Sequence, residues 1–302
     1  MLVSLSRVEN SGESVIELFR QLSNLLKLRI GIIMMLTALV AMLVTPGQTL
    51  SAVQVLVLSF AVLISAGSAG AFNQYFETDL DSVMKRTQNR PFVTGRFQKG
   101  PLWLLFIFSL LLAGIVPAAL MLNGAAAFYI FLGAFFYAIV YTVWLKRRST
   151  MNIVIGGASG SFAVLAGAAA VDPSLSPVPI MLAVVLFLWT PSHFWSLAIA
   201  KRQDYAAVGV PMLPLVIGDE KTTYVVLVKT LVLVGVSIMP FFYGLSWLYL
   251  AGAVSGGGYF IYHNCRMILD PSPKVAMQSF FASLVQLVLL LLGAVLDVFL
   301  LG

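Results

Sequence analysis

The chain has 302 residues, of which 60% are hydrophobic and only 10% are charged, and its formal net charge is +6. Because soluble domains carry about 25% charged residues, a soluble globular protein is excluded. In a membrane protein, the net positive charge is expected to reflect orientation in the bilayer and contact with anionic lipid headgroups, more than binding to nucleic acid. A single cysteine, Cys265, excludes an internal disulfide and a cysteine metal cluster, and two histidines cannot form a multi-histidine zinc site alone.

The N-terminal segment, residues 1–26, precedes the first long apolar block. It lacks the apolar core of a signal peptide, and its glutamates are atypical of a transit peptide. Its apolar residues fall at helical spacing, namely at Val15, Ile16, Leu18, Phe19, Leu22, Leu25 and Leu26. The segment therefore predicts a short amphipathic helix on the membrane surface.

About nine apolar blocks follow, each close to the length of roughly twenty residues that a membrane-spanning helix needs. The eighth is short and rich in glycine. Their cores are Leu28–Val44, Val53–Phe72, Leu102–Leu122, Ala125–Leu145, Ile153–Val171, Ile180–Ala200, Thr223–Leu245, Trp247–Tyr262 and Phe280–Leu301. The predicted fold class is an all-α, polytopic membrane helical bundle of about nine transmembrane helices, in a single domain covering residues 1–302.

Basic residues are confined to alternate loops of this arrangement. They are Arg7, Arg20, Lys27 and Arg29 around the start of the first span, then Lys85, Arg86, Arg90, Arg96 and Lys99, then Lys146, Arg147 and Arg148, then Lys201, Arg202 and Lys221, and finally Arg266 and Lys274. By the positive-inside rule, the N-terminus is expected in the cytoplasm and the C-terminus on the opposite side. Lys229 lies about two turns inside the seventh span, where it either snorkels to the headgroups or contacts a phosphate.

The stretch from Asn73 to Pro91, at the end of the second span, combines acidic and basic groups. Asn73, Glu77 and Asp81 recur every four residues, which places them on one face of a helix. Mg²⁺ prefers one or two carboxylates together with substrate phosphate oxygens, so Glu77 and Asp81 are candidate ligands, and Asn73 either donates to a phosphate oxygen or ligates the ion. Arg86 and Arg90 suit bidentate phosphate binding. The alternative is an ordinary juxtamembrane loop with salt bridges such as Asp81–Lys85.

A second polar region begins at the end of the sixth span. Asp204 stands where a further metal ligand would meet the first loop, and His193 lies about three turns from it on the membrane side. A lone histidine in a membrane helix is either a buried hydrogen-bonding group or a ligand.

The pattern from Asn73 to Pro91, Asn-x₃-Glu-x-Asp-x-Asp-x-x-Met-x-Arg-Thr-x-x-Arg-Pro, resembles the first signature of the protoheme IX farnesyltransferase (heme O synthase) family. That family belongs to the UbiA-type intramembrane prenyltransferase superfamily. The resemblance recurs at 150–157, 193–199 and 204–214, and it covers essentially the whole chain. The chain departs from the superfamily in having Glu77 where aspartate is usual, and only one aspartate, Asp204, in the second motif, so the resemblance leaves open one or two Mg²⁺ ions.

The resemblance implies that the farnesyl group of farnesyl diphosphate and a water add to a vinyl group of heme B, giving heme O and diphosphate. Catalytic Asn73, Glu77 and Asp81 would then act with Mg²⁺ held by Glu77, Asp81 and Asp204. Heme B would contact His193 and Trp195, and ring faces of Tyr75, Phe76, Phe194 or Trp195 would shield the allylic cation. The diphosphate would be bound by Lys27, Arg29, Lys85, Arg86, Arg90, Lys146, Arg147, Lys201 and Arg202. The expected setting is the bacterial cytoplasmic (inner) membrane, with heme A synthase or terminal oxidase assembly proteins as possible partners.

Three alternatives remain at this point. A prenyltransferase of the same fold would use a quinone precursor or a chlorin as acceptor. A membrane transporter would use the carboxylates as its transport site, although transporters place such ligands near the bilayer midplane. A purely structural membrane subunit would leave the acidic and basic constellation unexplained.

Overall fold

The computed structural model describes residues 13–301, and every regular element within that range is helical. The first half contains α1 (Glu13–Leu25), α2 (Leu28–Val44), α3 (Ala52–Phe76), α4 (Thr78–Val83), α5 (Pro101–Met121), α6 (Gly124–Phe135), the π-helical segment η2 (Phe136–Leu145), α7 (Asn152–Gly156) and α8 (Ala158–Val171). The second half contains α9 (Pro177–Ala200), α10 (Arg202–Ala207), α11 (Leu213–Ile217), α12 (Asp219–Ile238), the 3₁₀ segment η3 (Met239–Tyr243), α13 (Trp247–Leu269) and α14 (Pro273–Leu301).

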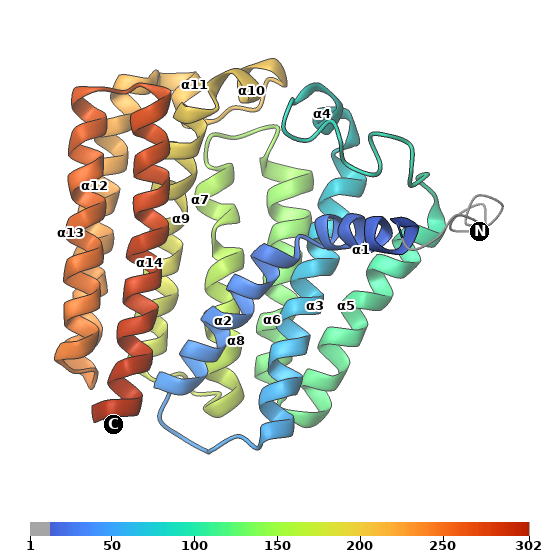
Figure 1. Ribbon diagram of the computed structural model, residues 1–302. Helices are drawn as coiled ribbons and strands as arrows, with labels where there is room; N and C mark the ends of the chain where they lie inside the picture. Colours follow the sequence, from blue (N-terminus) through green and yellow to red (C-terminus); the bar gives the residue numbers. More distant parts are fainter. Residues whose placement is uncertain (1–12, 302) are drawn as a thin grey trace.

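The long helices lie side by side and run alternately up and down, as Figure 1 shows. In residues 13–301, seven helical spans are long and apolar enough to cross a membrane, and an eighth is counted if the bent pair α1–α2 forms one span. Together with α13, these helices occupy the nine predicted blocks, so the predicted all-helical membrane bundle is confirmed. The short helices α4, α10 and α11 gather at one end, where the basic loops lie, and the C-terminus lies at the other (Figure 1).

Several helix starts are encoded locally. Ser51 and Gln54 form a capping box at the start of α3, and the Asn123 side chain accepts a hydrogen bond from the Ala126 amide at the start of α6. Proline occupies the first helical position of both α5 and α9, where its missing amide hydrogen costs nothing. Each of these signals stands directly before an apolar block.

Helix α1 meets α2 at a bend of 57° and lies across the bundle rather than along it (Figure 1). Ile16 and Phe19 are exposed, whereas Leu25 is fully buried against the bundle. An amphipathic helix in this orientation fits the predicted position on the membrane surface. The earlier part of the predicted segment, including Arg7, lies outside the described residues.

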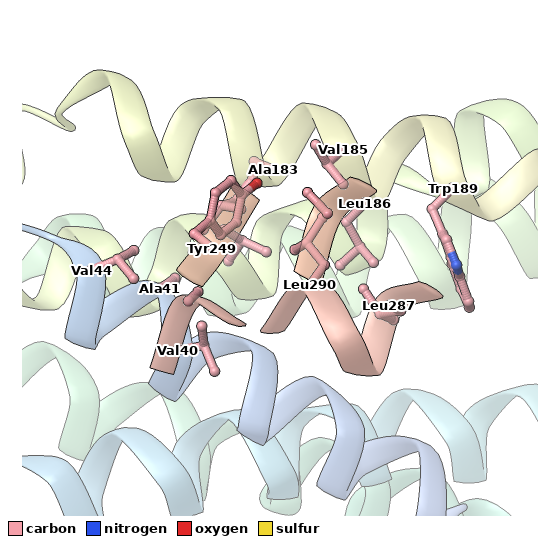
Figure 2. Close-up of a cluster of buried hydrophobic side chains, with 14 of the residues drawn as sticks. Val40, Ala41, Val44, Ala183, Val185, Leu186, Trp189, Tyr249, Leu287 and Leu290 are labelled. Atoms are coloured by element: carbon pink, nitrogen blue, oxygen red, sulfur yellow. The ribbon is translucent and has the colours of Figure 1, made fainter. Parts of the chain in front are cut away.

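The main apolar core lies where α2, α9, α13 and α14 meet. Figure 2 shows Val40 and Ala41 of α2 facing Leu186 of α9, Tyr249 of α13 and Leu290 of α14. These side chains tie the C-terminal group of helices to the N-terminal group. The bundle therefore holds its two halves, and the polar end they share, in a fixed relation.

The glycines in the eighth predicted span have a packing role. A Cβ added to Gly256 would stand 2.9 Å from Cα of Gln286 on α14, and one added to Gly257 would stand 2.7 Å from the Val234 side chain on α12. Small residues let membrane helices approach closely. α13 is a full helix through these glycines and continues seven residues beyond the predicted end at Tyr262, to Leu269.

Candidate active site

The acidic face predicted at the end of α3 is buried, not turned to solvent. Asn73, Glu77 and Asp81 are each at most 3% exposed. Glu77 interrupts the helix between α3 and α4, yet the backbone bonds from the Glu77 amide to Asn73 and from the Asp81 amide to Glu77 keep the four-residue spacing. Buried carboxylates need a cation or hydrogen-bond donors to compensate their desolvation.

Basic side chains from three other segments meet this acidic face. Lys146 Nζ lies 2.5 Å from Glu77 Oε2, and Arg90 Nη1 lies 2.5 Å from Asp81 Oδ2. Lys27 Nζ donates to Asn73 Oδ1 at 2.6 Å. The result is a compact, alternating set of charges in which the second Glu77 oxygen, Oε1, is buried and has no hydrogen-bond partner.

The π-helical segment η2 supplies the wall opposite α3. Its wider turn, seen in the bond from the Lys146 amide to the Tyr141 carbonyl, brings Tyr137, Tyr141, Thr142 and Lys146 toward the acidic face. The Tyr137 hydroxyl accepts from Lys27 at 2.8 Å, and Thr142 Oγ1 accepts from Asn73 Nδ2 at 3.0 Å. Wider π turns inside α-helices often occur at functional sites.

The loop after α4 folds back to deliver Arg90. Thr87 is buried, and its hydroxyl donates to the Asp81 carbonyl at 3.0 Å. The Arg90 amide then bonds to the Thr87 carbonyl. This turn explains why Asp81 pairs with Arg90 and not with Lys85, which is exposed.

The buried lysines of the cluster and the exposed Asp79–Arg147 pair at its rim differ in the cause of their pKa shifts. Burial and the nearby Arg90 lower the pKa of Lys27 to about 7, and burial lowers the pKa of Lys146 although Glu77 opposes that shift. At the rim, the exposed Asp79 forms a bidentate pair with Arg147 at 2.7 Å, and these hydrogen bonds lower the pKa of Asp79. Burial thus disfavours the ammonium forms of Lys27 and Lys146, and an anion bound beside them would oppose that shift, whereas the pair of Asp79 and Arg147 links α4 to the loop after η2.

Not every predicted residue joins this cluster. Among the side chains that the structure describes, at residues 16–301, no three of His, Cys, Asp or Glu gather closely enough to hold a metal ion, so the predicted set of Glu77, Asp81 and Asp204 is not assembled. Asp204 lies in α10, next to Tyr205, whose ring faces Arg86 at 5.7 Å. Arg202 pairs with Asp219 at the start of α12 instead of pointing to the cluster. The remaining predicted cations, Arg29, Lys85 and Lys201, are exposed.

The predicted heme-contacting residues lie on α9 in different surroundings. His193 is stacked between Trp189 and Phe280, each 4.2 Å away between ring centroids, and its Nδ1 lies 2.6 Å from Ser283 Oγ. Both ring faces are therefore covered. Trp195 belongs to another apolar cluster, and its buried Nε1 has no hydrogen-bond partner.

Two of the four rings suggested as cation shields have other partners, while Phe194 packs against the same apolar cluster as Tyr141. Tyr75 packs edge-on against Phe92, and Phe76 lies under Arg147. The rings that do flank the cluster are Tyr137 and Tyr141, stacked at 5.6 Å, and the Nζ atoms of Lys27 and Lys146 lie 5.2 and 5.5 Å from their respective ring centroids. Sequence reasoning missed both tyrosines, and their only signal was two polar rings four residues apart in an apolar block that Lys146 follows directly.

Fold and site together describe a polytopic helical membrane protein with a buried carboxylate and cation cluster at one end. The UbiA prenyltransferase family profile matches residues 34–289. Protoheme IX farnesyltransferase 2 of Paramagnetospirillum magneticum is 52% identical over 281 residues, which cover 93% of this chain and 98% of that protein. The chain belongs to the UbiA prenyltransferase family, so the transporter and structural-subunit alternatives are set aside.

Solved structures agree on the fold. A structure of digeranylgeranylglyceryl phosphate synthase in membranes has a TM-score of 0.78 at 18% identity, covering 93% of this chain and 99% of that one. A UbiA homolog from Archaeoglobus fulgidus bound to DMAPP and Mg²⁺ has a TM-score of 0.66 at 14% identity, covering 89% and 99%. At such low identities these likenesses establish the fold alone.

Proposed function

We propose that this chain is a heme O-forming prenyltransferase. It transfers the farnesyl group of farnesyl diphosphate to a vinyl group of heme B (protoheme IX), with addition of water, and releases diphosphate. The structural support is the buried acidic face, in which Glu77 Oε1 has no partner while basic groups surround it. The support for the acceptor is the name of the relative that is 52% identical.

The acidic face suits Mg²⁺. This ion is usually held in proteins by one or two carboxylates, with substrate phosphates and waters completing its shell, so Glu77 and Asp81 suffice and a third carboxylate is not needed. The unpartnered oxygen of Glu77 is the position that a cation would satisfy. When bound, Mg²⁺ would supply positive charge to the departing diphosphate. The Archaeoglobus fulgidus relative was solved with DMAPP and Mg²⁺.

The chain's own cations complete the diphosphate site. Lys27, Arg90 and Lys146 each hold a polar or acidic partner in this structure. An incoming diphosphate offers stronger acceptors, so these three groups would bind its oxygens and stabilise the charge that develops as the C–O bond breaks. Arg86, held over Tyr205, would reach the same anion from the rim.

The allylic cation left behind needs an apolar, electron-rich wall. Lys27 donates to the hydroxyl of Tyr137, and Lys146 Nζ lies 5.5 Å from the ring centroid of Tyr141; the faces of both rings carry the quadrupoles that attract a carbocation. Buried helices around them exclude water that would capture the cation early. We therefore assign the shielding to these two tyrosines instead of Tyr75 and Phe76.

His193 keeps a role on the acceptor side. Its two faces are covered and Nδ1 is engaged by Ser283, so Nε2 is the atom left to contact heme B as an axial ligand or a propionate partner. The protein would act in the bacterial cytoplasmic membrane with its basic end inside. Heme A synthase or oxidase assembly proteins would receive the product.

The deciding experiment is a turnover assay on the purified protein in detergent, with heme B, farnesyl diphosphate and Mg²⁺. We expect heme O to appear by chromatography and to vanish when Mg²⁺ is chelated. Failure of the wild-type protein to form heme O, together with prenylation of a quinone precursor, would contradict the acceptor. Unchanged turnover by Asp81→Ala would contradict the metal site.

His193→Ala tests the acceptor assignment separately. We expect loss of the Soret shift on heme titration while farnesyl diphosphate binding persists. Phe194→Ala, at a ring that only meets His193 edge-on, is the matched control. Equal heme binding by His193→Ala would show that the histidine is a packing group.

A further inference from the structure

A lipid-facing groove lies between α9 and α12, away from the carboxylate cluster. Its volume is about 370 Å³, and it is lined by Leu188, Tyr224, Val225, Val228, Lys229 and Val232. Apart from Lys229 and the Tyr224 hydroxyl the lining is apolar. Such a long apolar wall with a single cation matches the acyl chain and headgroup of a lipid.

Lys229 has no acidic partner. Among the side chains described, those of residues 16–301, no carboxylate lies within salt-bridge distance of its Nζ. A charged side chain on the wall of a membrane helix is costly and is normally paired or extended to the headgroups. Because side chains on an α-helix tilt toward its N-terminus, we expect Lys229 to extend toward the start of α12, at the basic end of the bundle.

The mouth of the groove is basic. Lys221, Val225 and Lys229 follow one another at four-residue spacing on one face of α12, so Lys221 stands roughly 12 Å above Lys229. Asp219 is already neutralised by Arg202 of α10, which leaves Glu220 as the unpaired acid in the first turn of α12. Two lysines against one acid leave a net positive face along the groove.

We propose that this groove is a binding site for an anionic phospholipid. An acyl chain lies along Leu188, Val228 and Val232, and the negatively charged headgroup is held by Lys229 and Lys221. Basic pockets between membrane helices on the cytoplasmic side recognise anionic headgroups in this way. The proposal is independent of the prenyl-transfer reaction, because α12 packs against α9 and α13 while the carboxylate cluster lies on α3, α4 and η2.

The test is native mass spectrometry of the full-length, delipidated protein titrated with phosphatidylglycerol or with phosphatidylcholine of the same chains. We expect wild type to prefer phosphatidylglycerol, and Lys229→Met to weaken its binding about fivefold without changing phosphatidylcholine binding. Val228→Trp, which fills the groove, should weaken both lipids. Lys274→Met, at an exposed lysine at the start of α14, and Val254→Trp, at an exposed valine on α13, are the matched controls.

Two results would overturn the proposal. One is phosphatidylglycerol binding by Lys229→Met equal to that of wild type, with both proteins eluting as the same folded species. The other is loss of protoheme binding in Lys229→Met with lipid binding intact, which would make the groove a porphyrin site. Farnesyl transfer in detergent without added phospholipid should be the same in wild type and Lys229→Met.

Discussion

At the scale of single residues, the site depends on charges that would be unfavourable alone. Glu77 is 1% exposed and satisfies only one of its oxygens through Lys146. Leaving a buried charge without compensation costs several kcal/mol. The burial of Glu77 is explained better by a role in ligand binding than by a role in folding stability, because an apolar residue at this position would pack equally well.

Glu77→Gln keeps the shape of the side chain and removes its charge. We expect kcat/KM for farnesyl transfer to fall about a hundredfold, because the developing diphosphate charge loses its stabilisation. Asp79→Asn is the matched control in the same stretch, since its exposed pair with Arg147 is a surface interaction and should change activity by no more than about threefold. Equal losses in the two variants would argue for a general charge effect.

Lys27 provides a pH test. Burial and Arg90 lower its pKa to about 7, so in the free protein the ammonium form prevails below that pH and the neutral amine above it. The diphosphate binds the ammonium form of Lys27. The affinity of the protein for farnesyl diphosphate should therefore weaken about tenfold when the pH is raised from about 7 to somewhat above 8. Isothermal titration with farnesyl diphosphate across this range measures the effect.

Lys27→Arg is the control for that titration, because a guanidinium stays protonated throughout. The ionisation of the diphosphate itself is common to both proteins and cancels in the comparison. If the affinity for farnesyl diphosphate depends on pH equally in the wild-type protein and in Lys27→Arg, Lys27 does not bind the diphosphate.

At the scale of elements, helix geometry decides which side chains meet. The apolar block 125–145 predicts a membrane-spanning helix, and the structure shows that its second half is π-helical and turns Tyr137, Tyr141 and Lys146 toward α3. Nothing in the local sequence demands the wider turn. It is stabilised by distant groups, namely Asn73 bonded to Thr142 and Lys27 bonded to Tyr137, so a local pattern could not reveal it.

The glycines of α13 give a prediction for the element scale. In Gly256→Ala the new Cβ would stand 2.9 Å from Cα of Gln286, so α14 must shift, and we expect a loss of about 1–3 kcal/mol of stability. Gly258→Ala is the matched control, because its Cβ would meet nothing within 4 Å. Thermal unfolding in detergent, followed by size-exclusion of the heated protein, should show a lower midpoint for Gly256→Ala alone.

At the scale of the whole molecule, the sequence predicted the fold better than the site. Apolar blocks located the helices because each must satisfy its backbone within the membrane, and alternate basic loops predicted the common end at which α4 and α10 lie (Figure 1). The sequence predicted the pairing of charged side chains less well. Asp81 pairs with Arg90 because of the Thr87 turn, and Arg202 at the start of α10 pairs with Asp219 at the start of α12. Both pairs depend on how the connecting loops fold, which residue spacing does not encode.

The orientation of the bundle is the remaining prediction at this scale. Cys265 is the only cysteine, so a Cys265→Ser background permits single-cysteine labelling. Gln88→Cys lies in an exposed basic loop and Thr49→Cys in an exposed loop at the opposite end. With a membrane-impermeant thiol reagent on intact cells, Thr49→Cys should label and Gln88→Cys should not, and inverted vesicles should reverse the result. The reverse pattern would place the carboxylate cluster on the outside, where the positive-inside rule does not allow it.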